Sequence, residues 1–359
     1  MKILHVAESI KGGVGTYLNH VVPPQIGELG SNRIRVIVPR QHMIQIPAIN
    51  SNCVRTFDRP NRSPGSLHNL YREIMREVSV FGPDVIHAHS TFSGAIVRSA
   101  FAFKQKSPRI VYCPHGWVFH ANLGKLGVSA AQLAERALAR FCDVVVAISN
   151  FEAREGERIG IPPLKLRVVH NGLPSTAPAP ISVSWPDSRL KVLFIGRLDR
   201  QKGLDILLEA VRPLTNEVHL RVVGEAILSD AERLKSPTNV EMMGWRIEPE
   251  IESLLQDCDL VVMPSRWEGF GFVALEAMRA ERAVLASAIG GLPEVVEDGV
   301  TGRLFPVGDV EAIRKLLLSI GKKELQAMGA AGRARFTSNF SIDMTHRALM
   351  GLYETLLAR

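Results

Sequence analysis

The sequence predicts an α/β protein of two domains, each built on a doubly wound parallel sheet. Short apolar runs alternate with amphipathic stretches along the chain, as strands and helices do in such sheets. One proline-rich, aperiodic segment, residues 174–180, interrupts this pattern, which restarts at Lys191. The chain has 359 residues, enough for two hydrophobic cores. We therefore expect domains at 1–173 and 191–340, joined by a linker at 174–190.

The first domain is expected to alternate strands with helices. Its apolar runs predict strands at Ile3–Ala7, Ile34–Val38, Val85–His89, Ile110–Cys113, Val144–Ile148 and Leu166–His170. Helical spacing of apolar residues predicts helices at Val14–Val22, Leu67–Phe81 and Ala130–Arg140.

The second domain repeats the alternation. Predicted strands are Lys191–Gly196, Val218–Val223, Val240–Met243, Leu260–Met263, Ala283–Ala286 and Gly302–Phe305. Predicted helices are Gly203–Val211, Glu248–Gln256, Phe272–Ala280, Leu292–Glu297, Val310–Ile320 and a last one at Met344–Leu357.

Composition narrows the class of protein. Apolar residues make up 46% of the chain, which argues against disorder. The four cysteines are widely spaced and form no C-x-x-C pair, so we expect reduced thiols in a cytoplasmic protein. The first apolar run stops at Glu8, unlike a signal peptide, and no apolar run is long enough to span a membrane.

The charge is unevenly distributed. Residues 1–180 hold 21 Lys and Arg against 11 Asp and Glu, whereas the remainder holds 22 against 25. A basic first half favours an anionic partner, which could be a membrane surface or an acidic glycan. No nucleic-acid-reading motif accompanies the charge, so we expect no nucleic acid partner.

The most informative segment is 264–278, with the sequence PSRWEGFGFVALEAM. Glu268 and Glu276 stand eight positions apart, the first in a strand-to-helix loop and the second about one turn into the helix. Glycines between them let backbone N–H groups approach an anion at the helix N-terminus. The amides could bind a diphosphate, and the two carboxylates could bind hydroxyl groups on either side of it. A nucleotide-sugar has this arrangement, with the sugar at one end of the diphosphate and the ribose at the other. The alternative is a pair of solvated surface carboxylates.

The segment resembles the Glu-seven-residues-Glu signature of retaining glycosyltransferase family 4, the glycosyl transferases group 1. The resemblance implies a GT-B fold, in which two Rossmann-like domains face each other across a central cleft. It also implies that the first domain binds the acceptor, that the second binds the donor, and that a terminal helix at about 341–359 crosses back onto the first domain. The donor contacts that it implies in this segment are Glu268, Gly269, Phe270, Gly271, Phe272, Val273 and Glu276.

A second element follows the restart strand, where Arg197 and Lys202 stand five positions apart around a turn. Two cations there could converge on one diphosphate, Arg as a planar fork and Lys as a point charge. The pattern resembles the family's G-R-x-x-x-x-K-G element, which binds the leaving diphosphate. Stabilising that charge would take the place of a metal ion, so we expect neither metal nor cofactor. Arg200 is expected to be a solvated loop residue.

Glycines also follow the first strand. Gly12 and Gly13 open a helix, where a glycine loop can cradle phosphate or form a tight turn. They do not fit G-x-G-x-x-G, and no acidic residue is clearly placed to hold a nicotinamide ribose. The family has a similar loop beside the donor diphosphate and the acceptor.

Histidines form the next group of candidates. His115 follows a strand and precedes a glycine, and the family has a comparable histidine near the anomeric centre. His120 is a candidate for the acceptor side. His87 and His89 alternate on a strand but lack a third ligand, so packing or hydrogen bonding is expected there rather than metal binding. In the second domain, Gly244, Trp245 and Arg246 follow a strand and could line the base pocket.

The sequence therefore predicts a retaining, metal-independent glycosyltransferase of hexosyltransferase type. The expected catalytic residues are His115, Glu268, Arg197 and Lys202. The expected partners are a nucleoside-diphosphate sugar and a glycan or lipid-linked acceptor of bacterial-type polysaccharide, lipopolysaccharide or glycolipid assembly. Location would be cytoplasmic, peripheral at the inner face of the cell membrane. A nucleotide-sugar epimerase of related fold, or a non-catalytic nucleotide-sugar-binding protein, is the alternative, and a nicotinamide dehydrogenase is disfavoured by its missing fingerprint.

Overall fold

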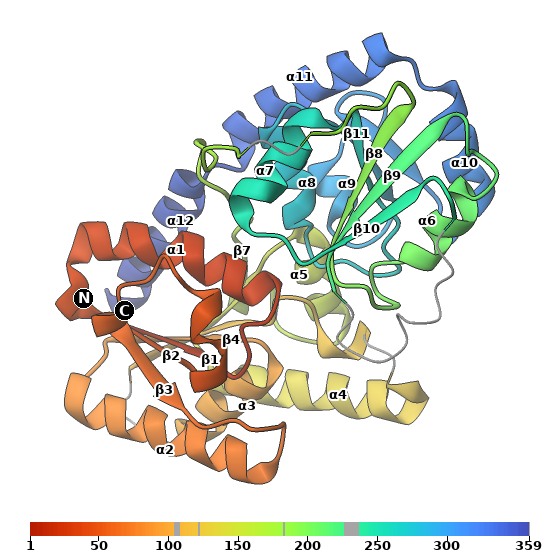
Figure 1. The fold of residues 1–359 in the computed structure, drawn as a ribbon. Coiled ribbons are helices and arrows are strands. Elements are labelled where there is room, and N and C mark those ends of the chain that lie inside the picture. The colour runs from red at the N-terminus through yellow and green to blue at the C-terminus, as the bar shows by residue number, and fades with distance from the viewer. Residues whose placement is uncertain (104–107, 121–122, 182–183, 226–236, 359) are drawn as a thin grey trace. The chain divides into compact units, whose positions relative to one another are not determined.

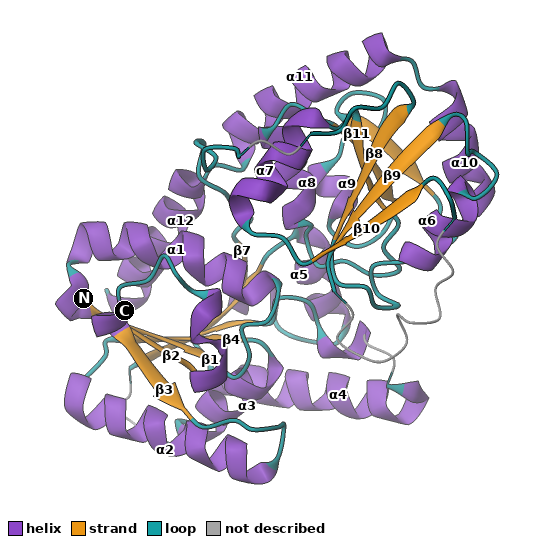
Figure 2. Cartoon of the chain, viewed as in Figure 1, coloured by secondary structure: helices purple, strands orange, loops and turns teal. Residues whose placement is uncertain are grey.

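The chain divides into two compact units. The first comprises Met1–Gly172 with Ile342–Arg359, and the second comprises Leu173–Ser341. The structure is a computed structural model that describes residues 1–103, 108–120, 123–181, 184–225 and 237–358. Each unit is an α/β domain on a parallel sheet, with seven strands in the first sheet and six in the second. Figures 1 and 2 show the helices and strands of both units.

In the first unit, the strand order is β3-β2-β1-β4-β5-β6-β7. Its strands are β1 (Ile3–Ala7), β2 (Ile34–Pro39), β3 (Val54–Phe57), β4 (Val85–His89), β5 (Arg109–Cys113), β6 (Val144–Ala147) and β7 (Leu166–Val168). Its helices are α1 (Gly13–Leu29), α2 (Pro64–Phe81), α3 (Thr91–Ala100), α4 (Gly124–Leu138), α5 (Asn150–Arg158) and α12 (Ile342–Leu357).

The two faces of the first sheet differ in chemistry. One face of β1 and β4 presents Leu4, Val6, Ile86 and Ala88, which join the apolar core beneath α2 and α3. The opposite face presents histidines in the same two strands, towards α1 and α12. Strand alternation explains the division, because successive side chains point to opposite faces of a sheet.

In the second unit, the strand order is β10-β9-β8-β11-β12-β13. Its strands are β8 (Leu190–Ile195), β9 (Val218–Val223), β10 (Val240–Gly244), β11 (Leu260–Met263), β12 (Ala283–Ser287) and β13 (Gly302–Phe305). Its helices are α6 (Leu204–Val211), α7 (Glu248–Asp257), α8 (Phe272–Arg279), α9 (Leu292–Val295), α10 (Val310–Ser319) and α11 (Lys322–Asn339). α6 and α10 pack together on one face, and α8 packs with α11 on the other.

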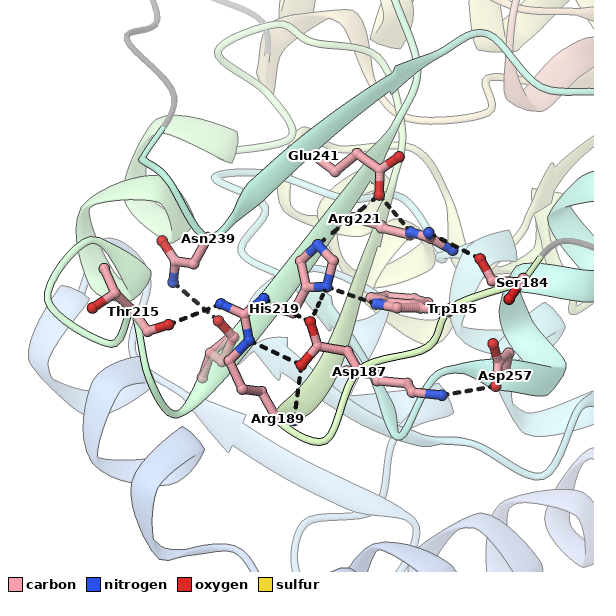
Figure 3. Close-up of polar contacts among 12 residues, drawn as sticks. Ser184, Trp185, Asp187, Arg189, Thr215, His219, Arg221, Asn239, Glu241 and Asp257 are labelled. Carbon is pink, nitrogen blue, oxygen red and sulfur yellow. Dashed lines mark hydrogen bonds and ion pairs between the residues drawn. The ribbon is translucent and has the colours of Figure 1, made fainter.

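The segment before β8 is held by a polar network on the second sheet (Figure 3). Trp185 is only 2% exposed and donates from its indole Nε1 to Nδ1 of His219, 3.0 Å away. The guanidinium of Arg221 lies 4.5 Å from the centre of the Trp185 ring and forms an ion pair with Glu241. Asp187 forms an ion pair with Arg189 at 2.6 Å. The end of the predicted linker, residues 184–189, is therefore bound to the sheet, and residues 182 and 183 lie outside the described residues.

Most predicted elements are present, with corrections. The prediction missed strand β3 and helices α3, α5 and α11. Helix α1 continues to Leu29 through Pro23 and Pro24, beyond the predicted end at Val22. The apolar side of α2 packs on the core as expected from its spacing, with Leu70 and Ile74 fully buried.

Candidate functional site

In the second sheet the strand order reverses between β8 and β11. Loops that leave the carboxyl ends of two such strands diverge, which makes this reversal the usual place for a ligand in α/β proteins. Here the loop after β8 carries Arg197 and Lys202, and the loop after β11 carries Glu268. Backbone hydrogen bonds join the loops, since the N–H of Arg266 donates to the carbonyl of Gln201 at 2.8 Å.

Lys202 and Glu268 form an ion pair between these two loops. The Lys202 Nζ lies 2.5 Å from Oε2 of Glu268, and their side chains are only 19% and 11% exposed. Neither residue is therefore an ordinary solvated charge, which was the alternative interpretation of Glu268. The pair places one cation and one carboxylate where an anion and a hydroxyl group could be bound together.

Arg197 is oriented by its own loop. Its Nε donates to Asp199 at 2.8 Å, and one terminal nitrogen donates to Gln201 Oε1 at 2.7 Å. Gln201 in turn donates to the carbonyl of Trp267 at 3.2 Å. Asp199 and Gln201 were not predicted as site residues, because a polar loop sequence does not show which side chain fixes the guanidinium. Arg200 is exposed, as predicted.

Helix α8 begins at Phe272, so Glu276 lies about one turn into the helix, as predicted. The backbone N–H groups of Phe272 and Val273 have no acceptor within the helix, because they belong to its first turn. No acidic residue occupies that turn, which leaves its positive end available to an anion. Burial raises the pKa of Glu276 to about 7, although Arg279 opposes the rise.

Gly290 allows the Glu268 loop to pack closely. Its φ is +61°, and a Cβ there would overlap the carbonyl oxygen of Glu268. The N–H of the next residue, Gly291, donates to that same oxygen at 3.2 Å. Only glycine fits this position, so Gly290 fixes the backbone of the carboxylate that the sequence singled out. The sequence contains this signal as the pair Gly290-Gly291, but its partner could not be predicted.

The predicted base-pocket residues lie at the end of β10. The carbonyl of Gly244 accepts from the N–H of Gly224 at 2.9 Å, which joins the ends of β9 and β10. The indole of Trp245 is 66% exposed, and Arg246 lies 3.5 Å from Glu250. An exposed aromatic ring at a strand's carboxyl end can stack on a base.

The first sheet has the same reversal, between β1 and β4. Gly12 precedes α1 with a φ of +82°, and both Gly12 and Gly13 are exposed. The chain between β1 and α1 is anchored by Glu8, which is 2% exposed and pairs with Arg59 at 2.7 Å and Arg62 at 3.1 Å. Glu8 was not predicted, since its arginine partners lie more than 50 positions away in the sequence.

His115 follows β5 with a φ of +52°, a left-handed conformation that is uncommon outside glycine. Its Nε2 lies 3.0 Å from Nδ1 of His89, and the Tyr17 ring packs edge-on against it. Burial lowers the pKa of His115 to about 3, so the ring is neutral at pH 7. Glu152 holds the next residue by accepting from the N–H of Gly116 at 2.5 Å.

His87 and His89 have the third partner that the sequence did not reveal. His5, on the neighbouring strand β1, is in register with His87, and Nδ1 of His5 lies 2.9 Å from Nε2 of His89. One nitrogen from each of the three rings lies within 4.8 Å of the others. The expectation that no third ligand is present is therefore wrong, because strand pairing brings together residues about 80 positions apart.

His120 follows His115 by five positions but has different contacts. Its Nε2 lies 2.9 Å from Glu155 Oε2, and its side chain is 25% exposed. Arg158 also pairs with Glu155 and, as the larger effect, lowers the pKa of that carboxyl. The predicted site residues thus form two groups, one in each unit.

Within the described residues, no helix is long and apolar enough to cross a membrane.

Comparison with known proteins identifies the family of this chain. Residues 20–176 match the family model described as Glycosyltransferase Family 4, and residues 189–322 match Glycosyl transferases group 1. A 41.2 kDa protein from the cps region of Klebsiella pneumoniae is 31% identical over 328 residues, which cover 88% of this chain and 89% of that protein. A protein assigned to colanic acid biosynthesis as glycosyltransferase WcaL of Escherichia coli K12 is 26% identical over 67% of this chain and 70% of its own length.

Solved structures share the fold. Anabaena HepE, solved in complex with UDP-glucose, superposes with a TM-score of 0.81 at 21% identity, over 99% of this chain and 100% of that one. The matched architecture is the GT-B fold of two parallel-sheet α/β domains. Together, the family models, the 31% identical relative and the shared fold show that this chain belongs to glycosyltransferase family 4, the glycosyl transferases group 1.

Proposed function

We propose that this glycosyltransferase moves a sugar from a nucleoside-diphosphate sugar to an acceptor hydroxyl with retention of anomeric configuration. The observation that carries the proposal is the largely buried Lys202–Glu268 ion pair at the strand-order reversal. Glu268 lies in the loop that leads into α8, whose first-turn N–H groups have no acceptor within the helix. Those three features together suit a diphosphate linked to a sugar rather than a lone anion.

Each part of the donor has a candidate contact in the second unit. Lys202, Arg197 and the first N–H groups of α8 would bind the diphosphate. Glu268 would position the sugar and Glu276 would accept from ribose hydroxyls, while Trp245 would stack on the base. The UDP-glucose complex of Anabaena HepE supports a donor of this class.

The reaction needs no carboxylate nucleophile in this scheme. The bond between the anomeric carbon and the diphosphate oxygen breaks, and a bond to the acceptor oxygen forms on the same face of the sugar. The acceptor proton passes to the departing phosphate. Lys202 and Arg197 would stabilise the charge on that phosphate, so no divalent cation is required there. Neutral His115 would contact the sugar.

The acceptor would be a glycan or lipid-linked saccharide of bacterial polysaccharide or lipopolysaccharide assembly. The relatives from the Klebsiella cps region and from colanic acid biosynthesis support this class. A lipid-linked acceptor would favour peripheral binding at an anionic membrane, through the exposed arginines of α2.

A donor screen followed by product analysis tests the function. A thermal-shift screen of UDP-, GDP- and ADP-sugars should find one nucleotide series that stabilises the protein by about 2.7 kcal/mol at 100 times its dissociation constant. NMR of the transferred sugar should show the donor's anomeric configuration. If the donor is epimerised when no acceptor is present, the protein is an epimerase. If the donor binds but no product forms, the protein is a non-catalytic nucleotide-sugar-binding protein.

The two glutamates should separate binding from turnover. Glu276→Gln should weaken donor binding, and Glu268→Gln should lower kcat, each by about 10- to 100-fold, because a charge-assisted hydrogen bond contributes about 1.5–3 kcal/mol. Calorimetry with the donor and steady-state kinetics measure the two effects. Glu241→Gln is the control, since Glu241 pairs with Arg221 away from these loops. Wild-type values in both site variants would disprove the assignment.

Lys202 should contribute mainly to leaving-group stabilisation. Lys202→Met should lower kcat by about 100-fold, and Arg197→Met by a similar factor, while EDTA in the assay leaves wild-type turnover unchanged. Lys191→Met is the matched control, because Lys191 pairs with Asp257 at the other end of β8. Loss of wild-type turnover in EDTA, with both variants still active, would mean that a dissociable metal holds the diphosphate.

His115 should act on the sugar rather than on the nucleotide. His115→Asn keeps a residue type that tolerates a positive φ, so it should fold while lowering kcat by at least about 10-fold. Affinity for the nucleoside diphosphate alone, measured by calorimetry, should match that of the wild type. The exposed His68→Asn serves as the control. A large loss of nucleotide affinity would place His115 at another part of the donor.

Most of the clustered arginines proposed to bind a membrane already form ion pairs within the protein. Arg55, Arg59, Arg62 and Arg76 each pair with a carboxylate, and Arg72 is exposed. We expect co-sedimentation with anionic vesicles that weakens with salt, since each basic group near the surface contributes about 1 kcal/mol.

Replacing Arg72 and Arg76 by Glu should reduce vesicle binding, whereas replacing the exposed Lys322 and Lys323 should not. Equal recovery on neutral and anionic vesicles would exclude electrostatic docking and leave a soluble acceptor.

A further inference from the structure

The three histidines His5, His87 and His89 form a buried cluster on the α1 and α12 side of the first sheet. All three side chains have zero exposure, and one ring nitrogen of each lies within 4.8 Å of the others. The diphosphate contacts of the proposed function lie in the second unit, and only His115 of that proposal touches the cluster, so the function gives these three histidines no role of their own.

Each ring has one nitrogen bound to an outer partner. Nε2 of His5 lies 2.7 Å from Oε1 of Gln25 on α1. Nδ1 of His87 lies 2.7 Å from the hydroxyl of Tyr353 on α12, and Nδ1 of His89 lies 3.0 Å from His115. These contacts fix the three rings from outside the cluster, on three different elements of the first unit.

The remaining three nitrogens are Nδ1 of His5, Nε2 of His87 and Nε2 of His89. The first and third are 2.9 Å apart, and the second is buried with no hydrogen-bond partner among the described residues. This division of each ring, with one nitrogen towards the centre and the other bound to an outer partner, is the arrangement that histidine ligands of metals adopt.

We propose that His5, His87 and His89 bind one divalent transition-metal ion, with Zn²⁺ as the ion that suits them best. Three neutral imidazoles are a common Zn²⁺ ligand set. Tetrahedral Zn–N bonds of about 2.0–2.1 Å separate the nitrogens by about 3.3 Å. The His5–His89 contact of 2.9 Å would open by about 0.4 Å, and nitrogens as far apart as 4.8 Å would close by about 1.5 Å.

One further observation supports a metal ion over hydrogen bonds alone. The hydroxyl of Tyr17 is also buried without a partner among the described residues, and its ring packs against His87 and His89. A buried polar group left unpaired costs about 1–3 kcal/mol. A metal ion would pair the free nitrogen of His87, and the unpaired Tyr17 hydroxyl is a candidate for a fourth, oxygen ligand.

The metal would act on His115 through His89. A ring that binds metal through Nε2 carries its proton on Nδ1, so His89 would donate to Nε2 of His115 and fix the tautomer of that ring. The ion would be structural, because the three ligands are fully buried and belong to β1 and β4. Brief EDTA treatment of the native enzyme is therefore no test of this site.

Metal content tests the proposal. The full chain, without a polyhistidine tag, is unfolded with chelator, refolded with Zn²⁺ and dialysed. Mass spectrometry of the metal should give about one Zn²⁺ per chain for the wild type and for His68→Ala, which removes an exposed histidine of the same unit. His87→Phe, which keeps an aromatic ring, should retain less than about a tenth of that amount. A wild type without zinc, or His87→Phe with the full amount, would overturn the proposal.

A second measurement does not depend on how His87→Phe folds. The Co²⁺-substituted wild type should show the intense visible absorption of a tetrahedral site, and His87→Cys should add a sulfur-to-metal band in the near ultraviolet. Weak octahedral bands in the wild type would contradict the assignment. Metal content and the Co²⁺ spectrum are independent of sugar transfer. The metal proposal can therefore fail while the proposed function holds, and the proposed function can fail while the metal proposal holds.

Discussion

The ion pair between Lys202 and Glu268 joins the loops that follow β8 and β11. These strands are neighbours in the second sheet although 65 positions separate the end of β8 at Ile195 from the start of β11 at Leu260. The pairing of β8 with β11 brings their carboxyl ends together. The two largely buried charges satisfy each other, which matters because a lone charge with so little exposure would be destabilising. A donor that binds here must therefore exchange this contact for its own phosphate and hydroxyl groups.

Backbone packing holds the two loops of the Lys202–Glu268 ion pair in place. Gly290 lies against the carbonyl of Glu268, and Gln201 ties both loops to Arg197. The site is thus built from backbone positions as much as from charged side chains. Glu276 lies in the helix that follows this loop, and burial raises its pKa to about 7. Hydroxyl groups that donate hydrogen bonds to its ionised form would stabilise that form and lower the pKa again. Between pH 4.5 and 7 the folded chain holds this proton more tightly than the unfolded chain, so this group's contribution to stability falls as pH rises.

The sequence predicted the architecture well where apolar strands are continuous. β1, β4, β9, β11 and β13 begin and end at the predicted residues. Helix α5 was missed because it is short and polar, and α11 because its sequence is weakly periodic. Helix α1 was cut short at Val22 because a proline, here Pro23, usually ends a helix. Strand β3 is only four residues long, too short for a clear pattern.

The site was predicted unevenly for a physical reason. Glu268, Lys202 and Arg197 lie in short segments whose spacing carries the chemistry, so they could be found locally. Partners such as Gly290 for Glu268, Arg59 for Glu8 and His5 for His87 are set by strand order and packing, which bring distant residues together. Alternation placed His87 and His89 on one face, but only the pairing of β1 with β4 supplied the third ring.

The central claim is that the loops after β8 and β11 bind the donor's diphosphate. Hydrogen exchange measured by mass spectrometry, with and without the nucleoside diphosphate found in the donor screen, tests it most directly. The account predicts slower exchange in peptides covering 196–204 and 264–276, with Lys202→Met reducing that protection. Protection confined to other peptides, or unchanged by that substitution, would contradict it.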